Sequence, residues 1–157
     1  MKSKKSWKEK LNDNKDLPKV QKVPARLRAK WGTGTFVIPA PLEVDGLMKL
    51  VPRRKLTTIN EIRSALAAKH KANLACPITT GIFAWIAANA ADEEAAATPR
   101  ARITPYWRTL KTGGILNEKY PGGVEQQRAR LEAEGHTIVA KGKKVVVVDH
   151  EKKLFQF

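Results

Sequence analysis

The stretch from Ile103 to His136 constrains this chain most, because it sets a proline, two aromatic rings and two glycine pairs ahead of a helical pattern. Pro105 disfavours a helical backbone at Thr104, the residue before it. Tyr106–Arg108 then places two rings and a guanidinium on consecutive positions. The start of the stretch therefore predicts a short extended segment or a turn.

The second part of the stretch combines glycine turns with a helix. Gly113-Gly114 and Gly122-Gly123 allow backbone turns that other residues avoid, or a close approach to a ligand. Four residues then follow helical spacing, namely Val124, Gln127, Leu131 and Glu134. Gly135 is a good stop for such a helix. We therefore expect a glycine-bearing loop followed by a helix that ends near Gly135.

This order of parts resembles the C-terminal domain of the O6-alkylguanine-DNA alkyltransferases. Their Pro-Cys-His-Arg active-site motif is followed by a Gly-Gly turn and a helix that ends in Glu-Gly. The matching residues are Pro105, Arg108, Tyr120, Gly122, Gly123 and Glu134. Tyr106 stands where the alkyl-accepting Cys would be, and Trp107 where the activating His would be. Loss of that Cys, usually to Trp, marks the alkyltransferase-like proteins, which bind damaged DNA without repairing it, and the chain is most similar to that group.

The resemblance implies an α+β, mostly helical fold with a winged helix-turn-helix and a C-terminal β-hairpin. The expected domain covers residues 31–157 and follows a basic N-terminal arm at residues 1–30. The resemblance also implies a pocket for an extruded base, lined by Tyr106, Trp107, Arg108, Tyr120, Gly122, Gly123, Glu134 and Asn89. The alternative is that Tyr106 and Trp107 are core aromatics beneath the Gly-Gly loop, and we expect at least one of them to be so.

The chemistry of alkyl transfer is missing from this motif. Transfer needs a thiolate activated by a neighbouring base, whereas a tyrosine hydroxyl has a reference pKa of about 10. Trp107 has only an N–H donor and cannot act as a base. Glu134, which orients the His in the enzymes, is expected to have no partner to orient. We therefore predict a protein that is not an enzyme.

Cys76 is the rival nucleophile. It lies directly before a predicted helix at Pro77, where a helix N-terminus can lower the pKa of a thiol. Most lone cysteines of this kind are small buried hydrophobes. A true transferase that uses Cys76, or another nucleophile, therefore stays an alternative.

Apolar spacing predicts three helices before the motif. The first spans Leu42 to Val51, the second begins near Ile59, and the third spans Ile78 to Ala88 after a turn at Ala72–Pro77. The last two form a helix-turn-helix, whose second helix enters a groove of DNA. Its apolar residues are Ile78, Ile82, Trp85 and Ile86. The expected DNA contacts here are Thr57, Thr58, Ile59, Asn60, Thr79, Thr80 and Phe83.

The resemblance assigns two further roles on the third helix. Asn89 matches an Asn that hinges into the active site of the family. Counting back from it places Thr80 at the position of an arginine finger, which fills the gap left by a flipped nucleotide. No Arg lies nearby in the sequence, so the residue that supports an extruded base is not identified.

Three segments outside the motif carry separate expectations. Met1–Lys30 is rich in lysine and is either a solvated tail or a basic arm on phosphate. Asp92–Arg102 is expected to extend the preceding helix and then form a surface loop. Thr137–Phe157 predicts a hairpin with a turn at residues 141–143. That hairpin is either a wing that contacts phosphate through Lys141 and Lys143 or an element that only closes the core.

Charge identifies the class of partner. The net charge of +15 and the pI near 10.2 favour a polyanion, and with the motif we expect double-stranded DNA, together with other repair proteins. No stretch is apolar and long enough to span a bilayer, and no signal peptide is recognisable, so we expect a cytoplasmic, nucleoid location, no membrane partner and a monomer. The alternative within this class is a basic winged-helix DNA binder without a lesion pocket.

Cysteine and histidine usage argues against a metal or a disulfide. The single Cys76 excludes an internal disulfide and a multi-Cys zinc site. His70, His136 and His150 are scattered and lack the spacing of metal ligands. We therefore expect neither a metal nor a cofactor.

Overall fold

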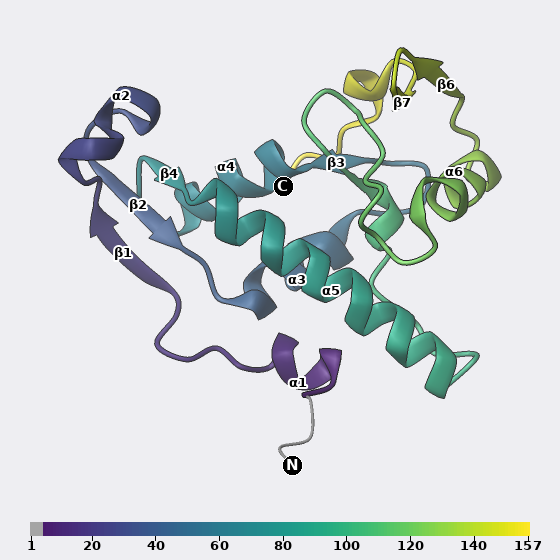
Figure 1. Ribbon diagram of the computed structural model, residues 1–157, viewed down its shortest axis with the longest axis horizontal. Coiled ribbons are helices and arrows are strands. Elements are labelled where there is room, and N and C mark those ends of the chain that lie inside the picture. Colours follow the sequence, from purple (N-terminus) through teal and green to yellow (C-terminus); the bar gives the residue numbers. More distant parts are fainter. Residues whose placement is uncertain (1–4) are drawn as a thin grey trace.

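The long helix α5 (Pro77–Ala97) runs through the middle of the molecule, and the other elements pack around it (Figure 1). The structure is a computed structural model, and it describes residues 5–157. A small sheet lies at one end, and a loop, a helix and a hairpin lie at the other (Figure 1). The predicted α+β, mostly helical fold is confirmed. None of the helices within residues 5–157 has the length and apolar character needed to cross a membrane.

Helices α3 (Pro41–Leu50) and α4 (Ile59–Lys69) pack against α5 and form the centre of the core. Pro41 suits the first turn of α3, and the Glu43 carboxylate accepts a hydrogen bond from the Ala40 backbone N–H at 3.0 Å. The buried side of α5 carries mainly alanines, namely Ala84, Ala87, Ala88, Ala90 and Ala91. These small side chains let the backbones of neighbouring helices approach closely. The predicted helices are confirmed, and α5 continues beyond Ala88 to Ala97, as expected for the Asp92 segment.

The N-terminal segment is part of the packed structure. It forms α1 (Trp7–Leu11), β1 (Lys19–Lys22), the 3-10 turn η1 (Ala25–Leu27) and α2 (Arg28–Trp31). Leu11 is buried in the main core, and the Trp7 ring meets Trp85 of α5 edge-on at 4.8 Å between centroids. The described part of this segment is therefore not a solvated tail. Residues 1–4 lie outside the described residues, and the domain boundary at residue 30 stays a prediction.

A three-stranded sheet joins the N-terminal segment to the helix pair. Strand β1 pairs antiparallel with β2 (Thr35–Ile38), and β2 pairs parallel with β4 (Leu74–Ala75) in the turn between α4 and α5. Phe36 and Cys76 are buried beneath this sheet with Val23 in a second apolar cluster. The sheet therefore fixes the start of α5, because the Cys76 backbone N–H donates to the Val37 carbonyl at 2.9 Å.

The C-terminal third starts with the 3-10 turn η2 (Tyr106–Arg108) and β5 (Thr109–Leu110), which pairs parallel with β3 (Thr57–Thr58). A loop leads to α6 (Gly123–Ala133), and the chain ends with the hairpin β6 (Ile138–Lys141) and β7 (Lys144–Val147) and the turn η3 (His150–Lys153). The predicted loop, helix and hairpin are confirmed.

The hairpin closes the core. The Leu116 N–H donates to the Val145 carbonyl, and the Val147 N–H donates to the Gly114 carbonyl, each at 2.9 Å. These bonds tie the hairpin to the glycine-bearing loop. Lys141 and Lys143 lie exposed at its tip, where they remain available to a polyanion.

Candidate nucleic-acid interface

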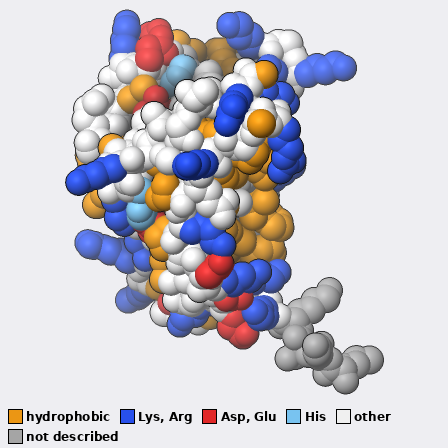
Figure 2. Space-filling model, turned by 90° about the vertical axis from the view of Figure 1, so that its left-hand side faces the viewer, with side chains coloured by type: hydrophobic (Ala, Val, Ile, Leu, Met, Phe, Trp, Pro, Cys, Tyr) orange, Lys and Arg blue, Asp and Glu red, His pale blue; other side chains and the backbone are white. Residues whose placement is uncertain are grey.

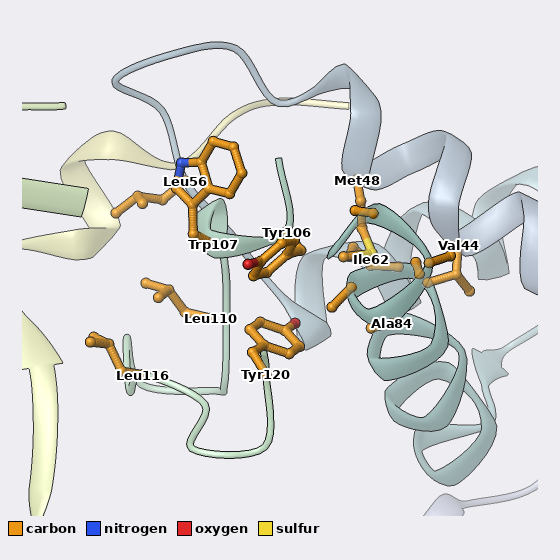
Figure 3. Packing of buried hydrophobic residues seen from close by; sticks show 14 of the residues in the cluster. Val44, Met48, Leu56, Ile62, Ala84, Tyr106, Trp107, Leu110, Leu116 and Tyr120 are labelled. Atoms are coloured by element: carbon orange, nitrogen blue, oxygen red, sulfur yellow. The ribbon is translucent and has the colours of Figure 1, made fainter. Parts of the chain in front are cut away.

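The two aromatic residues of the Pro-Tyr-Trp-Arg motif, Tyr106 and Trp107, lie in the core. Tyr106 is 1% exposed and Trp107 is 9% exposed. The Tyr106 ring packs edge-on against Trp107 at 5.4 Å and against Tyr120 at 5.6 Å between centroids (Figure 3). The Arg130 guanidinium covers the Trp107 ring at 4.3 Å from its centroid. Both rings are thus core aromatics, as the alternative interpretation held, and in this conformation Tyr106 has no ring face open to a base.

Glu134 is held by two neighbours from the motif, which corrects the expectation that it lacks a partner. Its carboxylate accepts from Trp107 Nε1 at 2.9 Å and from Arg108 Nε and Nη2 at 2.9 and 2.8 Å. Burial by itself would raise the pKa of Glu134, but the hydrogen bonds from Arg108 and Trp107 outweigh it and lower that pKa. Arg108 Nη1 also donates to the Val51 carbonyl at 2.8 Å. The Arg108–Glu134 ion pair therefore joins η2, the end of α6 and the end of α3.

We call Tyr106, Trp107, Arg108, Tyr120 and Glu134 the motif cluster. The two hydroxyl groups of the motif cluster are poor nucleophiles. The Tyr106 hydroxyl oxygen is buried without a hydrogen-bond partner, and burial raises the pKa of Tyr106. Burial likewise raises the pKa of Tyr120. Both groups stay protonated at neutral pH. Cys76 is buried in the second apolar cluster, which agrees with its interpretation as a small buried hydrophobic residue. Burial gives its thiol little access to a substrate.

Gln127 contacts the motif cluster and was not predicted to have a role beyond helix spacing. Its side-chain N–H donates to the Trp107 carbonyl at 3.1 Å, and its Oε1 accepts from the Asn117 backbone N–H at 2.7 Å. It thus ties α6 to both η2 and the glycine-bearing loop. The signal in the sequence was a polar residue at a core position of α6. Within residues 5–157, no group of three or more His, Cys, Asp or Glu side chains has the arrangement of a metal site.

The remaining predicted pocket residues are divided between the cluster and other elements. Gly122 has a φ of +80°, a left-handed backbone that favours glycine, and Gly123 begins α6. The Asn89 side chain donates to the Trp85 carbonyl at 2.9 Å, so it is engaged within its own helix, α5. The structure therefore brings Tyr106, Trp107, Arg108, Tyr120 and Glu134 together but holds Asn89 on α5.

Three of the predicted DNA contacts have buried side chains. Thr57 and Thr58 lie in β3 beneath the start of α4, and Thr80 is fully buried with its hydroxyl donating to the Cys76 carbonyl at 2.7 Å. These side chains cannot reach a DNA surface. Asn60 is exposed, and the others, Ile59, Thr79 and Phe83, are half-buried.

The outer side of α5 is apolar instead. Ile78 is 65% exposed, Ile82 is 45% exposed and Trp85 is 37% exposed. They recur at intervals of four and three residues, so they form one stripe along the helix. The alanines at 84, 87, 88 and 91 repeat on the opposite side of the same helix, so the spacing separates the two sides but does not say which of them is buried. We call Ile78, Ile82 and Trp85 the α5 stripe.

The α5 stripe forms one wall of a hollow of about 480 Å³. The complete lining is Ile59, Ile78, Gly81, Ile82, Trp85, Lys111, Asn117 and Lys119. Trp85 Nε1 donates to the Lys119 carbonyl at 3.1 Å, which fixes the glycine-bearing loop beside the helix. The hollow therefore lies between α5, the start of α4 and this loop, and its walls are apolar with two lysines at the loop side.

The surface around α5 combines apolar and cationic groups. The side that carries α5 in the foreground of Figure 1 lies along the right-hand edge of Figure 2, where hydrophobic side chains gather with Lys and Arg above and below them. Lys111 pairs with Glu118 at 2.7 Å, and Lys119 is exposed. A ligand with a negative backbone and flat apolar rings would match this arrangement.

Comparisons with solved structures found two that are similar to this chain. The structure of S. pombe ATL in complex with DNA is similar to the chain at 17% identity, with a TM-score of 0.51, over 74% of this chain and 94% of that one. A structure of S. pombe Atl1 in complex with damaged DNA containing O6-carboxymethylguanine gives the same identity and coverage with a TM-score of 0.48. The likeness to the former is one of fold. No protein-family model and no curated protein matches the chain.

Proposed function

We propose that this protein binds duplex DNA without catalysis and recognises O6-alkylguanine by holding the extruded base in the hollow beside α5, as a step in DNA repair. The observation that carries the proposal is this hollow, which is bounded by the exposed apolar side of the second helix of a helix-turn-helix and by two lysines. The fold likeness adds support, because the S. pombe ATL of the similar structure is in complex with DNA.

The groups that line the hollow suit a base. A base rotated out of the duplex is recognised by stacking and by hydrogen bonds at its edge. Trp85 and Ile82 offer apolar contact, and the Asn117 amide offers hydrogen-bonding groups. Lys119 on the loop would meet a phosphate beside the extruded nucleotide, and Lys111, which pairs with Glu118 at 2.7 Å, would contribute less. The predicted lesion pocket thus moves from Tyr106 and Trp107 to the outer side of α5.

The absence of catalysis follows from the motif cluster. The residue at the position of the acceptor Cys is Tyr106, whose hydroxyl is buried and stays protonated. The position of the activating His holds Trp107, whose N–H donates to Glu134. Neither side chain can attack an alkyl group as a thiolate would. We propose in addition a monomer in the cytoplasm, at the nucleoid, that hands the lesion to other repair proteins.

A binding comparison tests this function. Affinity for a duplex with one O6-methylguanine should exceed affinity for the same duplex with guanine at each salt concentration. The logarithm of both affinities should fall with the logarithm of salt by about 0.9 for each neutralised phosphate. Equal affinities would instead support a winged-helix binder without a lesion pocket, and a flat salt dependence would overturn the assignment to nucleic acid.

Mass spectrometry tests the absence of transfer. After incubation with methylated DNA, the chain should keep its unmodified mass. An added methyl group on Tyr106 or Cys76 would show a true transferase and overturn the proposal. The variant Cys76→Ser would show which of the two side chains had accepted the group.

A further inference from the structure

We infer that a basic surface on the N-terminal segment is a second DNA contact, which binds phosphates of the duplex on one side of the lesion. The surface consists of Lys22 at the end of β1 and of Arg26, Arg28 and Lys30 on η1 and α2, and we call it the N-terminal basic surface. None of these four residues lines the hollow beside α5. The inference rests on the DNA binding of the proposed function and adds a contact outside the lesion site.

The charge of this segment has one sign. Residues 17–42 hold five Lys or Arg residues and no Asp or Glu. Lys19 pairs with Asp16, whereas the four cations of the N-terminal basic surface are exposed and form no ion pair among the residues that the structure describes. Cations without acidic partners, gathered on one end of a molecule, are the electrostatic pattern that fits a polyanion.

The backbone that carries these cations is held in place by packing. Leu27 and Trp31 lie between the basic residues of η1 and α2 and pack against the second apolar cluster of Val23, Phe36 and Cys76. The Trp31 ring meets the Phe36 ring edge-on at 5.2 Å between centroids. A cationic surface on an ordered backbone loses less conformational entropy on binding than a solvated tail does. The segment therefore presents its charges in a fixed arrangement.

The N-terminal basic surface lies at the end of the molecule where α5 begins (Figure 1). Lys22 is opposite Thr35 in the sheet, and the Thr35 N–H donates to Asn73 Oδ1, in the turn before α5, at 2.9 Å. Neighbouring strands lie about 4.8 Å apart, so β1 is about 10 Å from β4. A duplex rises about 3.4 Å per base pair, which places the surface about three or more base pairs from a base held in the hollow. Figure 2 faces this end, and Lys and Arg side chains extend from it.

Other roles account for less of this surface. A lysine on an exposed edge strand prevents pairing with another chain, which would explain Lys22 but not the three cations that lie outside β1. A membrane-binding surface would present large apolar side chains among its cations. In η1 and α2 the large apolar residues, Leu27 and Trp31, pack inward instead. The phosphates of duplex DNA are the partner that fits all four cations.

The test compares wild type with the double variant Lys22→Gln/Arg26→Gln on three duplexes that share a central O6-methylguanine. One duplex is unmodified, and each of the others carries uncharged methylphosphonate linkages on one side, from about three to seven base pairs from the lesion. On the unmodified duplex the double variant should reduce the slope of log affinity against log salt by about 1.8, since each lost phosphate contact contributes about 0.9. On one neutralised duplex the two proteins should bind within about twofold of each other, and on the other the full difference should remain.

A matched control removes the same charge elsewhere. Lys141→Gln/Lys143→Gln neutralises two exposed lysines at the tip of the hairpin, at the other end of the molecule (Figure 1). Any loss of affinity in this control should not depend on the flank that matters for Lys22→Gln/Arg26→Gln. Preference for O6-methylguanine over guanine should be the same in wild type and in Lys22→Gln/Arg26→Gln, because both duplexes carry the same flanking phosphates.

The outcomes separate this contact from the proposed function. An unchanged slope in Lys22→Gln/Arg26→Gln would overturn the inference, as would a difference from wild type that is equal on both neutralised duplexes. The same flank dependence in the hairpin control would also overturn it, because general attraction would then explain the loss. A wild-type protein without lesion preference would overturn the proposed function, whereas flank dependence in that protein would still establish the second contact. We expect lesion preference to be kept and the loss to depend on one flank.

Discussion

The motif cluster and the α5 stripe differ in what they contribute to this protein. The cluster of Tyr106, Trp107 and Glu134 is buried, and its hydrogen bonds join three elements. The α5 stripe is exposed, and its largest ring carries only one hydrogen bond, from Trp85 to the Lys119 carbonyl. Residues that resemble a catalytic motif therefore hold the fold together, whereas residues that look like core line the hollow.

The difference shows that residues at the motif positions have a packing role in this protein. Glu134 accepts a hydrogen bond from Trp107 Nε1, and this bond helps to close the core. The ring of Tyr106 likewise fills space between Trp107 and Tyr120 rather than presenting a reactive atom. Substitutions in the two regions should therefore separate, with stability affected in the cluster and DNA affinity affected at the stripe.

The largest effect on stability is expected from Tyr106→Ala. Removing a fully buried ring leaves a cavity, and such changes cost about 3–5 kcal/mol of unfolding free energy. Tyr106→Phe removes only the unpartnered hydroxyl, so it should cost less than about 1 kcal/mol or stabilise the protein. Urea unfolding measures both. If Tyr106→Ala kept full stability and lost only lesion binding, the cluster would be a pocket after all.

A slightly smaller loss is expected from Glu134→Gln. The change leaves the Arg108 guanidinium without its charged partner in a largely buried site, which should cost about 2–4 kcal/mol. The matched control is Glu132→Gln, which breaks the exposed pair with Arg128 and should cost at most about 1 kcal/mol. Similar losses in the two variants, measured by urea unfolding, would show that the buried pair adds nothing special.

Acid should weaken the same region through His136. Burial lowers the pKa of His136 below its ordinary value, although Glu134 opposes this and Lys153 and Arg108 add to it. As pH falls through about 6.5, the unfolded chain therefore takes up a proton at this site more readily than the folded chain does. Stability should fall as pH drops from 7 to 5, by less than the loss from Glu134→Gln. In His136→Gln the fall should be reduced, and an unchanged pH profile would contradict this assignment.

Much of the fold was predictable because each helix carries its signals locally. Pro41 and Pro77 start helices, the glycines at 122 and 135 bound α6, and alternation marks the hairpin. The sheet β1-β2-β4 was not predicted, because β4 has two residues and β1 lies in a lysine-rich segment. Such strands form only through pairing with distant partners.

The site was harder to predict than the fold. The resemblance predicted the acceptor position at Tyr106, but the sequence left open whether Tyr106 and Trp107 line a pocket or lie in the core, and both rings are buried. On α5, the large apolar residues suggested the buried side of the helix. The alanines gave no indication that their own side is the one that packs against the core. The structure reverses the two sides, because close packing of α3 against α5 requires the alanines. Helical periodicity identifies two faces but does not say which one is buried when the apolar residues differ only in size.

On the exposed side, Ile82→Ala should separate affinity from stability. Ile82 lines the hollow and is 45% exposed, so its loss should cost less than about 1 kcal/mol of unfolding free energy. Affinity for an O6-methylguanine duplex should fall by about tenfold, since a buried aliphatic contact with the base is removed. Affinity for plain duplex, held mainly by phosphate contacts, should change little. Competition binding with the two duplexes measures this, and a fall in stability without a fall in affinity would place Ile82 with the core.

The smallest effect is expected at the lysines of the hollow, and it concerns salt dependence. Lys119 is exposed on the loop, so Lys119→Ala should reduce the slope of log affinity against log salt by about 0.9, the contribution of one phosphate contact. Lys111 is already neutralised by Glu118 at 2.7 Å, so Lys111→Ala should change the slope less. Glu118→Gln should raise affinity at low salt, because it releases Lys111 for a phosphate.

Titrations of plain duplex at several salt concentrations give all three slopes. Equally reduced slopes for Lys111→Ala and Lys119→Ala would show that the Lys111–Glu118 pair does not persist on DNA. Unchanged slopes in both variants would place the phosphates away from the hollow. That result would break the contrast between the α5 stripe and the buried motif cluster.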